Sequence, residues 1–508
     1  MASFVSFNPS TGAILGEYPI AKAAEVACVL EQAERLQERW ATKSVKERCL
    51  ALKALHAILA SNAACLAEAI TREIGKPLQE AYGADILTTL NALEWLEKSA
   101  PRTLRAQTLR GARKALLTPV AYGVVGVIGT WNYPVFLNAA PIAWALATGN
   151  VVVWKPSELA TGVATLLTGY CEEAGLPVLM ITGDGTTGRT LCRAGCDKIV
   201  FTGSAANGRA ILKELAANGT PSVMELSGND AMLVCADADI PLAARSAVWG
   251  RISNAGQSCV APQRIYVEEE VYDRFLTECH SHFDRLHPGT DFGPLRTDAL
   301  RRHAHTLVWD AVTHGATLLA GGRNLDERPG FFYAPTLLAG CHDGMRIMAQ
   351  DFFGPVLTVC RVHDAVEAIA HANDHDLALG ASIWTRNQWR GRQIAEQLQV
   401  GMVALNDILR DAANPTLPFG GLRASGFGKQ RGVQGLEEFI QWRVVSSYSS
   451  RGSRRHLFPY RPATIPILQS ILALKAAKSL AAKWQALRKF VQSARLWYKE
   501  AGSQQDRE

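Results

Sequence analysis

The feature that most constrains the fold of this 508-residue chain is an alternation of β-branched runs and helical segments between residues 124 and 217. The runs are too short for helices, and each is followed by a segment with apolar residues at helical spacing. They occupy residues 124–129, 150–154, 178–182 and 198–201. Such alternation predicts a doubly wound parallel sheet with helices on its faces, an α/β fold.

Two further regions extend this plan. Residues 21–100 have apolar residues mostly three and four positions apart, which predicts helices that cover the sheet. Residues 237–419 alternate again and predict a second α/β domain. Its expected strands are residues 265–267, 316–319, 356–359 and 402–405.

Charge is distributed unevenly along the chain. The net charge is +6, yet residues 451–508 contain 12 Lys or Arg and only 3 Asp or Glu. Residues 1–450 are therefore slightly acidic, and a boundary is expected where the basic extension begins.

Neither a secretory signal nor a metal site is predicted. The N-terminus lacks a basic start with a long apolar run, and the 11 cysteines form no repeated Cys-x-x-Cys pairs. Residues 115–154 are uncharged, but glycines and prolines interrupt them, so a buried strand, turn, helix and strand describe them better than a membrane span. A cytoplasmic protein is expected.

Two glycine-rich turns compete as phosphate-binding turns, because each leads from a strand towards a helix. Residues 183–188 fit the pattern G-x-G-x-x-G, but no acidic residue ends a strand about 20 residues later. The second turn is Thr202-Gly203-Ser204, with Gly208 beyond it. On the residues alone, each of the two turns could bind phosphate or could be only a tight turn.

Cys259 lies in a small, polar segment, residues 253–262, where a thiolate could meet a substrate. A free cysteine is more often buried and inert, so the segment alone leaves both interpretations open.

Seven motifs that occur together and in order favour a reactive Cys259 over an inert one. The sequence resembles the aldehyde dehydrogenase superfamily over about residues 5–450. The motifs are Thr130-Trp131-Asn132-Tyr133-Pro134, Trp154-Lys155-Pro156-Ser157-Glu158, Phe201-Thr202-Gly203-Ser204, Met224-Glu225-Leu226, Gly256-Gln257-Ser258-Cys259, Phe353-Gly354-Pro355 and Pro418-Phe419-Gly420-Gly421 with Ser425-Gly426.

The resemblance implies an aldehyde dehydrogenase-like fold in four parts. An NAD(P)-binding domain would span residues 1–236, with residues 121–143 contributing to oligomerisation, and a catalytic domain would span residues 237–430. Residues 431–450 would form an oligomerisation strand region, and residues 451–508 the basic amphipathic extension. The family also implies a homodimer or a homotetramer.

The same resemblance implies NAD(P)-dependent oxidation of an aldehyde to a carboxylic acid. Cys259 would be the nucleophile that forms a thiohemiacetal and then a thioester, and Asn132 would stabilise the oxyanion together with the backbone N–H of Cys259. Glu225 would activate the hydrolytic water. The alternatives are a coenzyme A-acylating dehydrogenase, whose known members generally lack this acid, and a non-catalytic scaffold on the same fold.

Nine residues match positions that bind the cofactor. A carboxylate at Glu158, near the adenine ribose, would repel a 2′-phosphate, so NAD is favoured and NADP stays an alternative. The family usually has glutamate where Asp351 stands, and the usual Leu-Gly-Gly-Lys is here Leu226-Ser227-Gly228-Asn229. The nine residues are Trp131, Lys155, Ser157, Glu158, Gly203, Ser204, Gly208, Asp351 and Phe353.

The basic extension predicts one amphipathic helix over residues 467–498, with Trp484, Phe490 and Trp497 along it. Peripheral contact with an anionic membrane, packing on a neighbouring subunit and a solvated extension all stay open. No nucleic-acid module supports binding to DNA or RNA. Membrane contact would favour lipophilic aldehydes as substrates.

Overall fold

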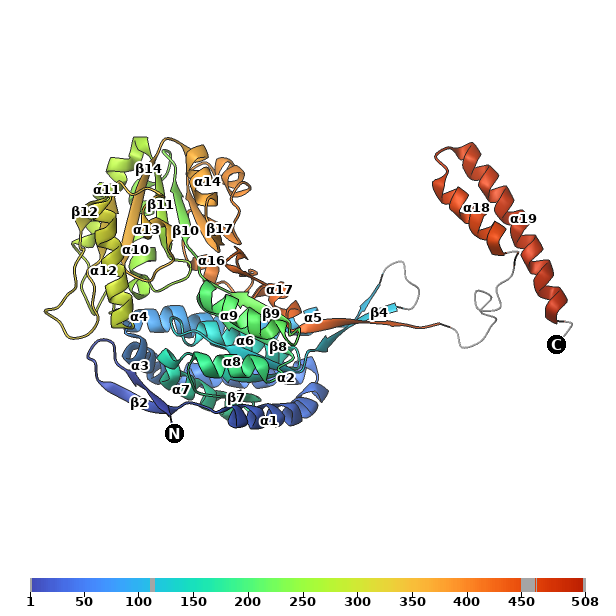
Figure 1. The fold of residues 1–508 in the computed structure, drawn as a ribbon, viewed down its shortest axis with the longest axis horizontal. Helices are drawn as coiled ribbons and strands as arrows, with labels where there is room; N and C mark the ends of the chain where they lie inside the picture. The colour runs from blue at the N-terminus through green and yellow to red at the C-terminus, as the bar shows by residue number, and fades with distance from the viewer. Residues whose placement is uncertain (1, 110–114, 449–461, 463, 506–508) are drawn as a thin grey trace. The chain divides into compact units, whose positions relative to one another are not determined.

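The computed structural model describes residues 2–109, 115–448, 462 and 464–505. Its contacts divide the chain into a large unit, residues 1–108 with 116–445, and a small unit, residues 109–115 with 446–508. The α/β fold class is confirmed by two mixed sheets, each built largely from parallel strands (Figure 1).

The first sheet contains the four expected strands and two others. Its order is β19-β9-β8-β5-β6-β7, and every neighbouring pair is parallel except β19 with β9. All side chains of β5 and β6 are buried, as expected of central strands covered on both faces. The strands are β5 (Val124–Ile128), β6 (Val151–Lys155), β7 (Val178–Met180), β8 (Lys198–Thr202), β9 (Ser222–Glu225) and β19 (Gly426–Phe427).

Helices from the first half of the chain cover this sheet, and their apolar faces form one continuous core with it (Figure 1). The longer helices before residue 104 occupy the region where helical spacing was seen. The helices are α1 (Ala23–Thr42), α2 (Val45–Ser61), α3 (Ala63–Ile74), α5 (Thr88–Thr103), α6 (Phe136–Ala147), α7 (Thr161–Glu173), α8 (Gly185–Arg193) and α9 (Ala205–Ala216).

The second sheet has the order β12-β13-β14-β11-β10-β16-β17 and is parallel except for β12. Successive side chains of β10 enter two different cores. Ala231 and Leu233 pack with α12 and α14, whereas Met232 and Val234 pack with α10 and α11. The strands are β10 (Asp230–Val234), β11 (Pro262–Glu268), β12 (Thr317–Ala320), β13 (Thr336–Ala339), β14 (Val356–Val362), β16 (Gly380–Trp384) and β17 (Met402–Leu405); the helices are α10 (Ile240–Ile252), α11 (Glu269–Phe283), α12 (Asp298–Thr313), α14 (Ala365–Asn373) and α15 (Gln388–Ala395).

The membership of β10 corrects the expected domain boundary. Strand β9 ends at Glu225 in the first sheet, and β10 begins at Asp230 in the second, so the chain passes between the sheets before residue 237. The prediction missed this because β10 follows β9 without an intervening helix, whereas the alternation pattern places a helix between strands.

Residues 121–143, predicted to contribute to oligomerisation, lie largely in the large unit's interior. Strand β5 lies inside the first sheet, and every residue of α6 is buried. Their part in oligomerisation stays a prediction. A three-stranded sheet in the order β20-β4-β3 has more exposed side chains. Its strands are β3 (Gln107–Thr108), β4 (Ala115–Ala121) and β20 (Ile440–Ser446).

The C-terminal extension contains two helices, so the single helix predicted over residues 467–498 is wrong. Helices α18 (Thr464–Ala476) and α19 (Leu480–Gln505) pack side by side (Figure 1). The chain breaks because Ser479 caps a new helix, its hydroxyl accepting from the backbone N–H of Ala482 at 3.2 Å. Residues 451–461, 463 and 506–508 of the predicted extension lie outside the described residues.

Among the described residues, no single helix is long and apolar enough to cross a membrane. Only α2 with α3, a pair bent by 72°, meets the length and composition of a span together. Leu52, Leu59, Leu66 and Ile70 of this pair are buried in the core of the first sheet.

Candidate active site

The parallel strands of the first sheet end at one edge, where their following loops line a cavity of about 590 Å³, called here the cofactor-side cavity. Eleven of the twelve predicted site residues line it; Gly208 does not. The eleven are Trp131, Asn132, Lys155, Ser157, Glu158, Gly203, Ser204, Glu225, Cys259, Asp351 and Phe353.

Both glycine turns reach this cavity. Ser204 caps α9, accepting from the backbone N–H of Asn207 at 3.3 Å, so the N-terminus of α9 lies at the cavity wall. A Cβ atom at Gly203 would come within 2.5 Å of the Phe201 ring, so the wall there is bare backbone. Gly208 serves packing instead, because a Cβ atom there would lie 2.4 Å from Leu226.

The first turn, residues 183–188, contains the start of α8 at Gly185. Asp184 caps this helix by accepting from the backbone N–H groups of Thr186 at 2.8 Å and Thr187 at 3.4 Å. Gly185 and Gly188 of the same turn also line the cofactor-side cavity. The side chain of Asp184 therefore already holds the first N–H groups of α8, whereas the cap of α9 is an uncharged serine.

An ion pair stands at the cavity wall between β6 and α7. Nζ of Lys155 lies 3.2 Å from Oε2 of Glu158, with the lysine side chain 4% exposed and the glutamate side chain 42% exposed. Burial lowers the pKa of Lys155, and the nearby Glu158 carboxylate opposes that shift. The carboxylate is therefore the more accessible charge of the pair.

Cys259 follows a strained turn that aims it at the strand ends. Asn254, Ala255 and Gly256 all have positive φ angles, 50°, 54° and 72°. A Cβ atom at Gly256 would lie 2.0 Å from the carbonyl oxygen of Gly354, so glycine is required there. Left-handed conformations at two residues other than glycine persist only where the surroundings hold them.

An amide network supplies that hold. Nδ2 of Asn132 donates to the carbonyl oxygen of Gln257 at 3.0 Å, and Nδ2 of Asn254 donates to the carbonyl oxygen of Asn132 at 2.9 Å. The backbone N–H of Asn254 donates to Oε2 of Glu80 at 2.8 Å. Residues 253–262, the cysteine loop, are thus hydrogen-bonded to the loop that contains Asn132.

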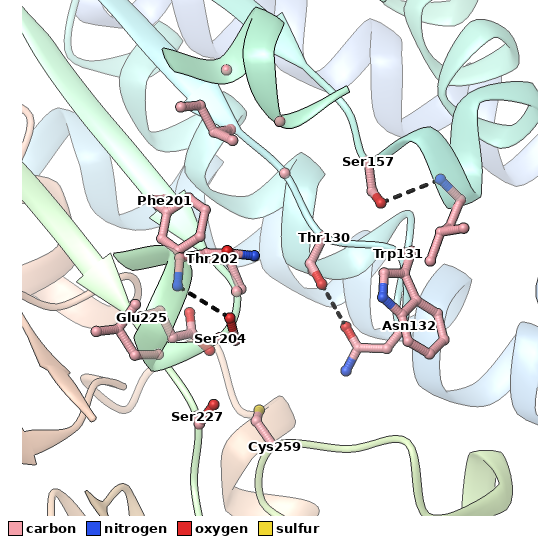
Figure 2. A pocket seen from close by; sticks show the side chains of 18 of the residues that line it. Thr130, Trp131, Asn132, Ser157, Phe201, Thr202, Ser204, Glu225, Ser227 and Cys259 are labelled. Carbon is pink, nitrogen blue, oxygen red and sulfur yellow. Dashed lines mark hydrogen bonds between the residues drawn. The ribbon is translucent and has the colours of Figure 1, made fainter. Parts of the chain in front are cut away.

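A second cavity of about 600 Å³, called here the substrate-side cavity, shares Cys259 with the first. Its wall is largely apolar and aromatic, with the charged Glu80, Asp407, Arg410 and Arg431 also lining it. The wall comes from residues 79–88, α6, α10 and loops late in the chain. In Figure 2, the Cys259 sulfur lies between the labelled side chains of Glu225 and Asn132. Residues of the second wall include Tyr133, Phe136, Leu137, Trp249, Val260, Leu409, Phe419 and Arg431.

The pKa values of Glu225 and Cys259 are both raised, which favours the neutral form of each side chain. Glu225 is 2% exposed, and neither carboxylate oxygen has a hydrogen-bond partner among the described residues. Burial raises the pKa of Glu225 to about 7, against a smaller opposing effect of Arg431. Burial also raises the pKa of the Cys259 thiol well above 9.0, and the Glu225 carboxylate raises it further.

Asp351 reaches the cofactor-side cavity despite its shorter side chain. Ser227, which stands where the family usually has glycine, lines the same cavity and lies close enough to affect the pKa of Asp351. Burial raises the pKa of Asp351, while Ser227 and the Arg251 guanidinium lower it. The two departures from the family pattern therefore lie close to each other.

Comparison with known proteins agrees with this geometry. The aldehyde dehydrogenase family profile matches residues 2–445. The chain belongs to the aldehyde dehydrogenase family. It is 36% identical over 480 residues to the 4,4'-diapolycopene aldehyde oxidase of Methylomonas sp., covering 91% of this chain and 89% of that protein. It is 31% identical over 461 residues to an NADP(+) succinate-semialdehyde dehydrogenase of Deinococcus radiodurans, covering 88% and 95%.

A solved structure matches equally well. The indole-3-acetaldehyde dehydrogenase of P. syringae, solved with NAD+, superposes with a TM-score of 0.84 at 29% identity, covering 88% of this chain and 93% of that one. This aldehyde dehydrogenase is thus an NAD(P)-dependent oxidoreductase acting on aldehydes, as the sequence resemblance implied. The cavity fits such a dinucleotide, because it joins the N-terminus of α9, whose cap is uncharged, to buried carboxyl groups beside the thiol.

The sequence motifs missed several residues of this aldehyde dehydrogenase site. Arg431 lines the substrate-side cavity in a glycine-rich segment just beyond the last recognised motif, and that isolated arginine was the available signal. Gln257 lies inside a recognised motif, but its carbonyl oxygen accepts the bond from Asn132, and the residue type does not predict such a backbone contact. Glu80 and Asn254 reach the site only through tertiary contacts.

Proposed function

We propose that Cys259 is the nucleophile, Glu225 the general base and Asn132 the oxyanion donor in oxidation of an aldehyde to a free carboxylic acid. The observation that supports this best is the meeting of the two cavities at Cys259, with Glu225 and Asn132 beside it. The thiolate attacks the aldehyde carbon from the substrate side. An N–H of the Asn132 amide and the backbone N–H of Cys259 stabilise the oxyanion.

NAD(P), when bound, accepts the hydride released from that carbon. The remaining thioester is hydrolysed when Glu225 takes a proton from water, the hydroxide attacks the carbonyl carbon and the Cys259 thiolate leaves. A pKa of about 7 suits a base that must be unprotonated and still basic near neutral pH. The two free oxygens of Glu225 give water a place to bind, which favours hydrolysis over transfer to coenzyme A.

For the cofactor, we propose that the N-terminus of α9 at Ser204 binds the pyrophosphate and that Lys155 and Glu158 bind the adenine ribose hydroxyls. Asp351, beside Ser227, would bind the other ribose, with Trp131, Ser157 and Phe353 completing the wall. Because the exposed carboxylate of Glu158 repels a 2′-phosphate, NAD is preferred and NADP is the weaker cofactor.

For the substrate, we propose a lipophilic aldehyde with a long apolar chain. The names of relatives point in two directions, towards diapolycopene aldehyde and towards the charged succinate semialdehyde. The substrate-side cavity supports the first, because Phe136, Trp249 and Phe419 contribute rings to its wall. Apolar surface of this kind favours a chain that leaves water on binding.

A panel of aldehydes tests the substrate and the product together. We expect kcat/KM to rise from propanal to decanal and to be lower for succinate semialdehyde, with free acid as the product when coenzyme A is present. A preference for succinate semialdehyde would contradict the lipophilic substrate, and a thioester product would contradict hydrolysis.

For assembly, we propose a homodimer or homotetramer formed through β20. This strand lies at the edge of its three-stranded sheet, and Val444 and Val445 are 58% and 44% exposed. An unpaired edge with exposed valines is a template for pairing with another strand.

For the extension, we propose contact with an anionic membrane surface. Lys475, Lys483, Arg488 and Arg495 accompany exposed apolar side chains on α18 and α19, and no Asp or Glu occurs between residues 451 and 499. This combination fits an interfacial helix pair rather than a solvated one. The exposed apolar residues are Ile465, Leu468, Leu472, Leu480, Trp484, Leu487, Val491, Leu496 and Tyr498.

Liposome co-sedimentation tests this contact. The full chain should sediment with phosphatidylglycerol vesicles and much less with phosphatidylcholine vesicles, and deletion of residues 456–508 should abolish the difference. Equal binding by the deleted and full chains would contradict the proposal.

A further inference from the structure

Arg431 is a buried cation beside the reactive sulfur that the proposed chemistry leaves unused. It is 2% exposed and immediately precedes α17 (Gly432–Glu437). Its guanidinium carbon lies 4.1 Å from the ring centre of Phe419 and 5.1 Å from that of Phe136. An arginine held between two rings in a cavity wall keeps a fixed position.

Its hydrogen bonds leave part of the guanidinium unsatisfied. Nη1 donates to the carbonyl oxygen of Ala412, but Nε has no partner among the described residues. A buried charged group without full pairing is costly, so a negative charge formed nearby would stabilise the guanidinium. No carboxylate forms a salt bridge with Arg431 in the described part of the chain.

The position of Arg431 relative to the sulfur is informative. Arg431 lines only the substrate-side cavity, Glu225 lines only the cofactor-side cavity, and Cys259 lines both. Arg431 therefore approaches the sulfur from the substrate side, where Glu80 and Asp407 also line the cavity, whereas Glu225 and Asp351 line the cofactor side. Three carboxyl groups raise the pKa of the Cys259 thiol. Those carboxyl groups are Glu225 at the end of β9, Asp230 at the start of β10, and Asp351 before β14.

We propose that Arg431 is a positioning residue that supplies the counter-charge for the Cys259 thiolate from the substrate side. This inference rests on the proposed role of Cys259 as nucleophile. Without a cation, a thiolate formed among three carboxyl groups would face only repulsion and desolvation. With Arg431 held by Phe136 and Phe419, the negative charge on sulfur has one fixed partner.

The directions of the pKa shifts agree with this arrangement. Burial, Glu225, Asp230 and Asp351 all raise the pKa of the Cys259 thiol, and Arg431 lowers it. Burial lowers the pKa of Arg431 itself to about 10, so the guanidinium stays charged at neutral pH. The charge that the thiolate needs is therefore present throughout the working pH range.

The test is the pH dependence of iodoacetamide alkylation at Cys259, followed by peptide mass spectrometry on the full-length protein. Arg431→Met and Arg431→Gln should raise the midpoint by roughly one unit, and so slow alkylation at neutral pH about tenfold. Arg431→Lys should retain most of the wild-type midpoint, because it keeps the charge.

Two internal controls separate this effect from others. The exposed Cys28 and Cys65 should keep their alkylation midpoints in every variant. Arg410 lines the same cavity, but its side chain is 85% exposed, so Arg410→Met should leave the Cys259 midpoint in place. NAD binding by fluorescence shows that each variant is folded.

An unchanged Cys259 midpoint in both folded neutral variants would overturn the inference, as would an equal shift in Arg410→Met. Failure of the proposed function gives a different result from failure of this inference. If Cys259 is not the nucleophile, Cys259→Ala keeps its turnover, and this result does not depend on the alkylation midpoints of the Arg431 variants.

Discussion

The two cavities that meet at Cys259 are built in different ways. The cofactor-side cavity is lined mostly by loops that follow strands of one parallel sheet, together with the N-terminus of α9. The substrate-side cavity is assembled from residues 79–88, α6, α10, the loop that contains Cys259 and segments after β17. The first reuses backbone geometry common to α/β sheets, whereas the second depends on side chains brought from distant parts of the chain. The sequence therefore predicts the residues of the cofactor-side cavity better than those of the substrate-side cavity.

The largest expected effect comes from removing the thiol that lines both cavities. Cys259→Ala should reduce kcat by roughly 10³-fold or more, because no other thiol lines either cavity among the described residues. NAD binding, measured by fluorescence, should persist. A variant that kept its turnover would mean that the two cavities do not serve one reaction, and a wild type without turnover on any aldehyde would favour the scaffold alternative.

The next effect belongs to the cofactor side. Glu225→Gln should lower steady-state turnover by about 10²–10⁴-fold, because hydrolysis loses its base, while one equivalent of NADH still forms in a rapid burst. In the wild type, hydrolysis should increase as pH rises through about 7, where Glu225 loses its proton. Stopped-flow absorbance measures both. Equal loss of the burst and of turnover would contradict a role confined to hydrolysis.

The same substitution has a signed effect on stability. The folded-state pKa of Glu225 is raised from 4.5 to about 7, so the folded state binds the proton more tightly than the unfolded state. Burying the carboxyl therefore costs nothing extra below pH 4.5 and costs most above pH 7. Glu225→Gln should raise Tm at pH 8 relative to wild type, with a smaller gain at pH 5, in thermal melts.

A smaller effect belongs to the substrate side. Trp249 is 56% exposed at the wall of that cavity, so Trp249→Ala should raise KM for decanal by about tenfold and leave KM for NAD unchanged. Trp389, 69% exposed on α15 and outside both cavities, supplies the matched control Trp389→Ala. A parallel rise in KM for NAD would show that the two cavities are not independent.

The smallest effect tests cofactor choice. Glu158→Gln removes the exposed carboxylate and leaves Lys155 unpaired, so the ratio of kcat/KM for NADP to that for NAD should rise several-fold. Steady-state assays with both cofactors measure it. A ratio that stays the same would place the 2′-position away from Glu158.

The amino-acid sequence alone predicted the α/β fold class, the family and eleven of the residues that line the cofactor-side cavity. These follow from local patterns: β-branched runs make central strands, and residues that follow parallel strands meet at one edge. Packing in three dimensions places β10 in the second sheet, buries α6 and lets Ser479 divide the extension into two helices. Packing also brings Arg431 to the cavity of Cys259, 172 positions away in the sequence, which sequence spacing does not reveal.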